Sequence, residues 1–346
     1  DGFETFLFVP NATAKTGTHI HDAIDSKRIM SMVVIALMPA LLFGMYNVGY
    51  QHFKAAGAEA FAAASFFEMF AYGFLAVLPK IIVSYIVGLG IEFVVAQWKK
   101  EEIQEGFLVS GILIPMIVPV DCPLWILAIA TAFSVIFAKE VFGGTGMNIF
   151  NVALITRAFL FFAYPTKMSG DAVWVSGNSI FGLGQQVDGL TVATPLGLAA
   201  TSGSVPEFSM DMVYGLIPGS IGETSVIAIA LGGILLLWTG IASWKTMFSV
   251  FVGGAFMAFV FNAIGPDTAM AQMPWYEHLV LGGFCFGAVF MATDPVTSAR
   301  TETGKYIFGF LIGAMAIIIR VLNPGYPEGM MLAILLMNIF APLIDY

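Results

Sequence analysis

Long apolar segments, each close to the length needed to cross a lipid bilayer, recur along almost the whole chain of 346 residues. A bilayer core about 30 Å thick requires roughly 20 apolar residues per helix. Hydrophobic residues make up 58% of the chain and charged residues only 11%, whereas about a quarter of the residues in soluble domains are charged. The sequence therefore predicts an all-α polytopic membrane protein.

Ten segments of this kind are predicted to span the membrane, and some of them contain Gly and Pro, which are typical of broken helices. The predicted spans are 29–48, 79–97, 107–120, 124–142, 150–164, 224–242, 246–264, 276–293, 306–321 and 329–344. Two of the short ones, 107–120 and 150–164, are bounded by Gly and Pro, so we expect them to be tilted, broken or partly re-entrant.

Lysine and arginine residues are distributed unequally over the segments between the spans. In short loops these residues remain on the cytoplasmic side of the membrane. With ten spans, the side that holds the chain ends has nine of them, namely Lys15, Lys27, Arg28, Lys99, Lys100, Lys139, Lys245, Arg300 and Lys305. The opposite side has three, namely Lys54, Lys80 and Lys167. The pattern predicts an even number of spans with both termini in the cytoplasm.

This orientation divides the chain into four parts. Residues 1–28 form a cytoplasmic N-terminal segment, 29–164 a first group of five helices, 165–223 an extracytoplasmic loop, and 224–346 a second group of five helices. The stretches "AKEVFGGTGMNIFNVALITRAF" and "IIRVLNPGYPEGMMLAILLMNIFAP" end the two groups in a similar way. Broken helices at matching positions indicate two inverted five-helix repeats, and two unrelated kinked helices are the alternative.

Composition also excludes some classes of function. The formal net charge is −9 and the chain has no cluster of Lys and Arg, which argues against binding of nucleic acid, because phosphate contacts require such clusters. The two cysteines, Cys122 and Cys285, lie far apart in the sequence without metal-ligand spacing, and we expect no disulfide.

Charge in or at the ends of predicted spans is costly and usually functional, and three of the carboxylates found there are considered as candidates. Glu92 is either an ion ligand or a buried carboxylate that pairs with Arg157. Asp294 precedes Pro295, which frees backbone carbonyls beside a carboxylate and suits a hard cation such as Na⁺; a carboxylate that caps the next turn is the alternative. Asp345, at the end of the last span, is expected at the surface.

Two Gly-containing stretches are candidates for ligand contact. The segment "FGGTGMNIFN" lacks the Lys-Ser/Thr ending of a nucleotide-binding loop. Its Asn148 and Asn151 offer amide donors and acceptors that suit the polar edge of a flavin, although they could equally satisfy helix ends. The second stretch, "DGLTVATP" at 188–195, is a small, hydroxyl-rich loop in the longest polar interruption of the chain.

From "DSKRIMSMVVIALMPALLFGMYN" to "APLIDY", the chain resembles the family of the B subunit of the sodium-translocating NADH:quinone oxidoreductase, whose sister is the D subunit of the Rnf complex. The stretches that carry the resemblance are "AKEVFGGTGMNIFN", "RAFLFFAYP", "IPGSIGE", "MPWYEHLVLGGFCFG", "FMATDPVT" and "NPGYPEGMMLAIL", several of which favour the sodium pump over Rnf.

This resemblance implies a covalent cofactor on the polar loop. Members of the family carry FMN on the last Thr of a D-x-x-[ST]-G-A-T pattern, attached through a phosphoester by a dedicated flavin transferase. Asp188, Thr191 and Thr194 match this pattern, with Thr194 as the acceptor, while Val192 replaces the usual Gly.

The resemblance also implies further ligand sites. A riboflavin is expected at Ser110, Asn148 and Asn151. A quinone is expected at Gly88, Glu105 and Phe107. The sodium path is expected at Glu92, Phe286, Phe290, Asp294 and Asp345.

Taken together, the resemblance implies a subunit of a multi-subunit complex in the bacterial cytoplasmic (inner) membrane. Such a subunit passes electrons from covalent FMN to riboflavin and quinone, coupled to Na⁺ export. One alternative is an Rnf D-like subunit of a ferredoxin:NAD⁺ oxidoreductase. A second alternative is a solute channel of inverted-repeat type without a redox role.

Overall fold

The computed structural model describes residues 14–18, 26–100, 106–323 and 325–346. Within these residues the regular structure is helical, apart from an isolated bridge between Ile180 and Leu183. Five helices in this part of the chain are long and apolar enough to cross a membrane. They are α2 (Ser26–Ala56), α4 (Phe66–Lys99), the segment Leu124–Phe142, α12 (Trp244–Ile264) and α16 (Glu302–Leu322). The prediction of an all-helical, multi-pass membrane protein is confirmed at this level.

The other helices in the described residues are shorter. Four are apolar, namely α5 (Phe107–Met116), α7 (Val152–Ala163), α11 (Val226–Trp238) and α17 (Met330–Asp345). The segment Leu124–Phe142 consists of α6 (Leu124–Ser134), the π-helical turn η1 (Val135–Lys139) and the 3-10 turn η2 (Glu140–Phe142). The remaining pieces are α3 (Ala58–Ala63), α8 (Pro165–Met168), α9 (Pro195–Ser202), α10 (Met210–Tyr214), α13 (Ala269–Gln272), α14 (Trp275–Val280), α15 (Phe284–Phe286) and the π-helical turn η3 (Gly287–Met291).

The predicted second span, 79–97, lies inside a longer helix. Helix α4 begins at Phe66, because Ser65 and Glu68 form a capping box in which each side chain bonds the backbone N–H of the other residue. An acidic residue such as Glu68 is unfavourable within a span, but at the first turn it stabilises the helix start. Pro79 then lies inside the helix.

The predicted single span 276–293 is wrong. The segment is interrupted between α14 and α15 at Gly282 and Gly283, whose φ angles of +66° and +69° lie in the left-handed region. Beyond this break, η3 continues the helix as a π-helical turn. This segment therefore brings irregular backbone into the interior of the protein.

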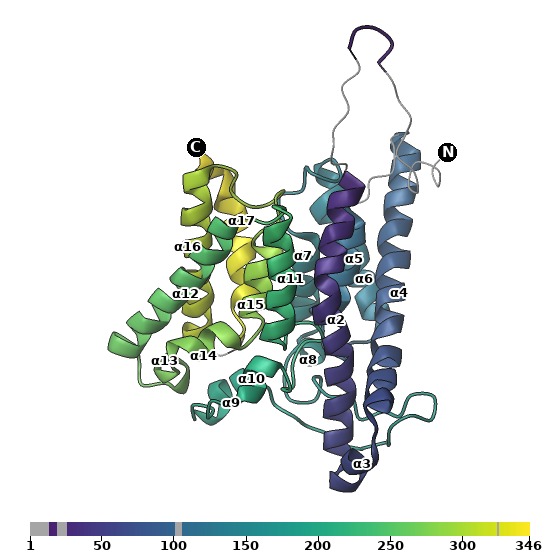
Figure 1. The fold of residues 1–346 in the computed structure, drawn as a ribbon, viewed down its shortest axis with the longest axis vertical. Helices are drawn as coiled ribbons and strands as arrows, with labels where there is room; N and C mark the ends of the chain where they lie inside the picture. The colour runs from purple at the N-terminus through teal and green to yellow at the C-terminus, as the bar shows by residue number, and fades with distance from the viewer. Residues whose placement is uncertain (1–13, 19–25, 101–105, 324) are drawn as a thin grey trace.

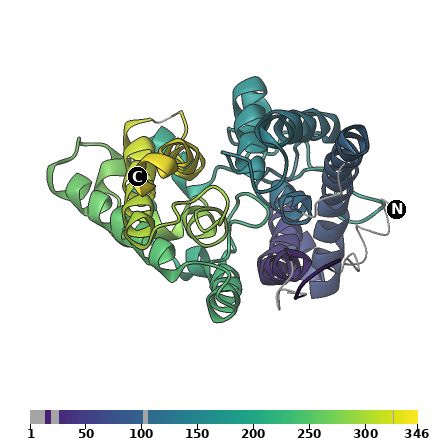
Figure 2. The same ribbon diagram turned by 90° about the horizontal axis from the view of Figure 1, so that it is seen from above.

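The helices form two groups that lie side by side (Figure 2). In the first group α4 packs against α2, α5 and α6, and in the second α12 packs against α14 and α16. The groups meet where α2 contacts α11 and where α7 contacts α17. Small residues permit close approach, since a Cβ added to Gly73 would fall on the carbonyl oxygen of Met45, and one added to Gly313 on that of Val250.

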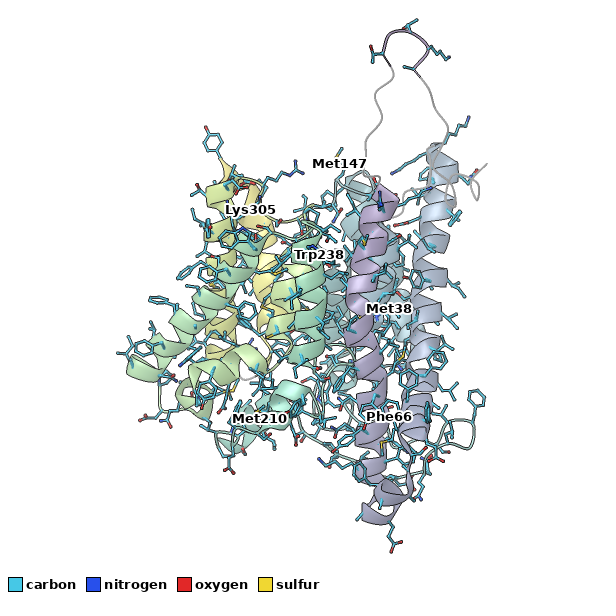
Figure 3. The ribbon with its side chains drawn as sticks, viewed as in Figure 1. Met38, Phe66, Met147, Met210, Trp238 and Lys305 are labelled. Atoms are coloured by element: carbon cyan, nitrogen blue, oxygen red, sulfur yellow. The ribbon has the colours of Figure 1, made fainter. Side chains whose placement is uncertain are left out.

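The two ends of the molecule differ in what they carry. Helix α2 begins and α17 ends at the upper end in Figure 1, whereas α3, α9 and α10 lie at the lower end. Figure 3 places Met147 and Lys305 toward the upper end and Phe66 and Met210 at the lower end. The Gly-rich segment 143–151 and the loop that holds Thr194 therefore lie toward opposite ends of the molecule.

Candidate functional site

A cavity lies between the two groups of helices, toward the upper end of the molecule. It contains about 840 Å³ of empty space, its open mouth included. Its walls come from the first turn of α2, from α5, from the segment 143–151 and the start of α7, from the end of α11, and from residues 290–296. Five residues that the sequence singled out line it together, namely Ser110, Asn148, Asn151, Phe290 and Asp294.

Asn151 links the two breaks in the backbone. It is the N-cap of α7, and its side-chain oxygen accepts hydrogen bonds from the backbone N–H groups of Ala153 at 3.0 Å and Leu154 at 3.3 Å. Its amide nitrogen donates to Asp294 at 3.4 Å. Asn151 therefore has both roles considered for it, since it caps the start of α7 and also lines the cavity. Asn148 donates to the Phe150 carbonyl at 3.0 Å.

Asp294 organises the turn that follows η3. Its carboxylate accepts hydrogen bonds from the Val296 N–H at 3.0 Å and from the Thr297 hydroxyl at 3.1 Å. The capping role considered for Asp294 is therefore confirmed. Within the described residues no lysine or arginine forms an ion pair with it. A half-buried carboxylate that lines the cavity in this way suits a cation.

Glu92 forms a buried ion pair, but its partner is Lys139 and not Arg157. Both side chains are about 5% exposed or less. Lys139 was counted among the cytoplasmic loop residues, because its position near the end of a predicted span gave no sign of burial. The π-helical turn η1 widens the helix locally at these residues, and Lys139 contributes to the cavity wall.

Arg157 pairs instead with two other carboxylates. It contacts both carboxylate oxygens of Glu223 at 2.9 Å and forms a second ion pair with Glu328. Two hydroxyl groups extend the cluster. The Ser220 hydroxyl accepts a hydrogen bond from Arg157 at 3.4 Å, and the Tyr326 hydroxyl donates one to Glu328 at 3.5 Å. This network joins α7 to the end of the loop 165–223 and to the segment between α16 and α17.

Thr194 lies near this network, at the start of α9. Its hydroxyl oxygen accepts a hydrogen bond from the Gly197 N–H at 3.0 Å and so caps the helix. The side chain is half-buried and borders two cavities, both of which Glu328 also lines. Asp188 and Thr191 are exposed.

The loop that carries these residues is anchored on α2 and α4. His52 Nδ1 lies 2.6 Å from the Ser176 carbonyl oxygen and Nε2 accepts the Gln185 N–H at 3.2 Å, an arrangement that requires the proton on Nδ1. Tyr72 stacks on His52 and donates to the Asn178 carbonyl at 2.6 Å. These bonds hold part of the loop 165–223 on the first group of helices.

Two of the residues predicted to contact quinone, Gly88 and Phe107, do not line the cavity. Phe107 is fully buried, and its ring occupies the space that a Cβ on Gly88 would need. Tyr85 packs edge to face on Phe107 with ring centroids 6.4 Å apart. Glu105 lies outside the described residues. The next residue, Gly106, lines the cavity.

Two predicted residues of the sodium path lie in the interrupted segment. Phe286 in α15 is fully buried, and its ring centroid is 5.1 Å from that of Phe290 in η3. Asp345 has a structural role, since it accepts hydrogen bonds from the N–H groups of Arg300 at 2.7 Å and Thr301 at 2.9 Å, next to the start of α16. Asp345 does not line the cavity.

Comparison with known proteins identifies the family. The family model described as NQR2, RnfD, RnfE matches residues 13–346. The chain belongs to this family. Among its relatives are proteins named as the B subunit of Na(+)-translocating NADH-quinone reductase, from Ectopseudomonas mendocina and from Pseudoalteromonas atlantica. They are 46% and 45% identical to it over 100% and 99% of the chain and over 90% and 89% of their own lengths. The predicted family is therefore confirmed.

Three charged residues that form ion pairs in the interior of this protein were not predicted as site residues from its sequence. Lys139, Glu223 and Glu328 were not assigned roles, although the stretches "IPGSIGE" and "NPGYPEGMMLAIL" contain the two glutamates. A signal was present, because a carboxylate within a long apolar sequence must find a partner. The partners are far apart in the sequence, so only the fold shows the pairs.

We predict that Arg157→Met destabilises the protein by about 3–5 kcal/mol, because it leaves two buried carboxylates without their cation. Thermal unfolding of the detergent-solubilised protein measures the loss. Lys245→Met is the matched control, since its partner Glu302 has a side chain that is 64% exposed and solvent-screened pairs contribute little to stability. Equal melting temperatures for Arg157→Met and wild type would contradict the prediction.

Proposed function

We propose that this chain is the B subunit of a Na⁺-translocating NADH:quinone oxidoreductase, which passes electrons from covalent FMN to riboflavin and quinone and exports Na⁺. The observation that carries this proposal is the identity of 46% over the entire chain with a relative of that name. The complex would require further subunits, and a flavin transferase would act during maturation. An Rnf D-like subunit remains the second candidate, because the family model also covers RnfD.

The cavity suits riboflavin as the non-covalent cofactor. Apolar walls with a few hydroxyl and amide groups, from Ser110, Asn148 and Asn151, match a flat ring system with polar edges. When bound, a flavin supplies the ability to accept and release one electron at a time. The side chains of this chain would hold and orient it.

Thr194 is proposed as the attachment point of FMN. Its hydroxyl oxygen would form the phosphoester, and the start of α9 favours negative charge at that position. The exposure of Asp188 and Thr191 leaves the loop accessible to the flavin transferase. Two adjoining cavities offer space beside the attachment point.

Asp294 is proposed as the central group of the sodium path, which would also involve Phe286, Phe290, Glu92 and Asp345. Asp294 lies in the same cavity as the proposed riboflavin contacts, so the charge on the flavin and the cation would act on each other over a short distance. Moving one charge against 100 mV costs about 2.3 kcal/mol. The quinone site is proposed at Gly88, Glu105 and Phe107.

The membrane topology is proposed as ten spans in two inverted repeats of five, 29–164 and 224–346, with 1–28 cytoplasmic and 165–223 extracytoplasmic. Packing supports the repeats, because α4 contacts α6 and α6 contacts α7 in one group, while α12 contacts α16 and α16 contacts α17 in the other. Lys305 lies toward the end of the molecule where α17 ends, as expected if that end is in the cytoplasm of a bacterial cell.

We predict that Thr194→Ala abolishes the flavin fluorescence of this polypeptide on a denaturing gel, when the protein is produced with its flavin transferase. Loss of the hydroxyl removes the only atom of this residue that can form the phosphoester. Thr201→Ala, in the same helix, should keep the fluorescent band. A fluorescent Thr194→Ala band would place the flavin on another residue and overturn the attachment at Thr194. A wild-type chain of unmodified mass would favour a channel without redox function.

We further predict that Asp294→Asn raises the Na⁺ concentration for half-maximal activation about tenfold, which corresponds to a loss of about 1.4 kcal/mol of binding free energy. Removing the carboxylate charge weakens cation binding, while the amide still fits the space. Quinone reduction by the assembled complex, measured over a Na⁺ series, tests this. Asp267→Asn, at an exposed position, is the control. An unchanged Na⁺ activation curve would exclude Asp294 from the sodium path.

A further inference from the structure

Lys139 is the cationic side chain of the upper cavity. Among the described residues that line the cavity, it is the only lysine or arginine. It belongs to the π-helical turn η1, a rare conformation that is frequent at functional sites. The same cavity contains Ser110, Asn148 and Asn151. A ligand held by these three residues therefore occupies the cavity that Lys139 lines.

The pairing of Lys139 is incomplete. An ammonium group has three N–H donors, and the acceptor that the described residues offer it is one carboxylate oxygen of Glu92. The other carboxylate oxygen, Glu92 Oε2, is buried and has no hydrogen-bond partner within the described part of the chain. The pair thus keeps unused hydrogen-bonding capacity on both partners, although both side chains are buried.

A ligand in the cavity could use this capacity. Burial of an ion pair with unused donors and acceptors is costly, and a well-packed apolar pair would serve stability equally well. Such a pair next to a cavity indicates a role toward the ligand that the cavity holds. Because the local dielectric is low, a cation at the cavity wall strongly favours any ligand that gains negative charge.

We propose that Lys139 is the group that stabilises the reduced form of the flavin in this cavity, and that Glu92 limits this effect by sharing the lysine charge. The inference rests on the proposed riboflavin site. The two members of the buried pair then act in opposite directions, because Lys139 raises the reduction potential of the flavin and Glu92 lowers it. A merely structural pair would not produce opposite effects.

Three variants of the assembled complex test the proposal by potentiometric titration with dithionite under anaerobic conditions. At the wild-type midpoint potential, Lys139→Met should lower the ratio of reduced to oxidised riboflavin at least tenfold, equal to a shift of about 59 mV for one electron. Glu92→Gln should shift the potential in the opposite direction. Lys99→Met, which removes the half-exposed neighbouring pair with Glu140, should leave it unchanged.

A fourth variant and a second measurement keep the test decisive. Lys139→Met combined with Glu92→Gln leaves no unpaired buried charge, so it should assemble even where a single variant does not. It should also lower the potential, because Lys139 lines the cavity and Glu92 does not, so loss of the lysine charge outweighs loss of the carboxylate charge. Shifts of the same sign in Lys139→Met and Glu92→Gln, or a wild-type potential in the double variant with riboflavin retained, would overturn the inference alone. Absence of extractable riboflavin from the wild-type complex would overturn the proposed function and this inference with it.

Discussion

Backbone N–H and C=O groups have no water to bond with inside a bilayer, so every interruption of a helix must be enclosed by protein. Among the described residues, helices are interrupted at 143–151, at 281–283 with 292–301, and at 323 and 325–329. Side chains from other parts of the chain form hydrogen bonds with residues of these segments. The upper cavity and the ion pair between Arg157 and Glu328 lie at these segments.

Arg320 shows how strongly this constraint acts. It is fully buried, and its guanidinium donates to the carbonyl oxygens of His278 at 2.7 Å, Leu281 at 3.2 Å and Glu328 at 3.0 Å. One side chain thereby satisfies backbone from two separate interruptions. Nearby, Arg157 forms ion pairs with two carboxylates. The hydrogen bond between Asn151 and Asp294 joins the interruption at 143–151 to the segment after η3. The proposed ligand sites therefore lie where the fold already requires polar side chains.

The all-helical membrane class and the position of most helices could be predicted from the sequence, which also singled out Asn148, Asn151 and Asp294 of the cavity wall. Apolar length and the position of Gly and Pro are local properties, so the chain itself reports them. The pairing of Glu92 with Lys139 could not be predicted, because that contact depends on a π-helical turn and joins residues far apart in the sequence. The start of α4 at Phe66 could not be predicted either, because Glu68 is unfavourable in a span but favourable at a helix cap.

The proposed function requires a flavin in the cavity between the two groups of helices. Polar side chains of the first group would lie on one side of this flavin, and the Asp294 carboxylate would lie on the other. A cryo-electron microscopy map of the assembled complex, at a resolution that shows side chains, tests this most directly. We expect isoalloxazine density in contact with Ser110, Asn148 and Lys139. A map in which lipid or water fills this cavity, with every flavin elsewhere, would contradict the proposed site.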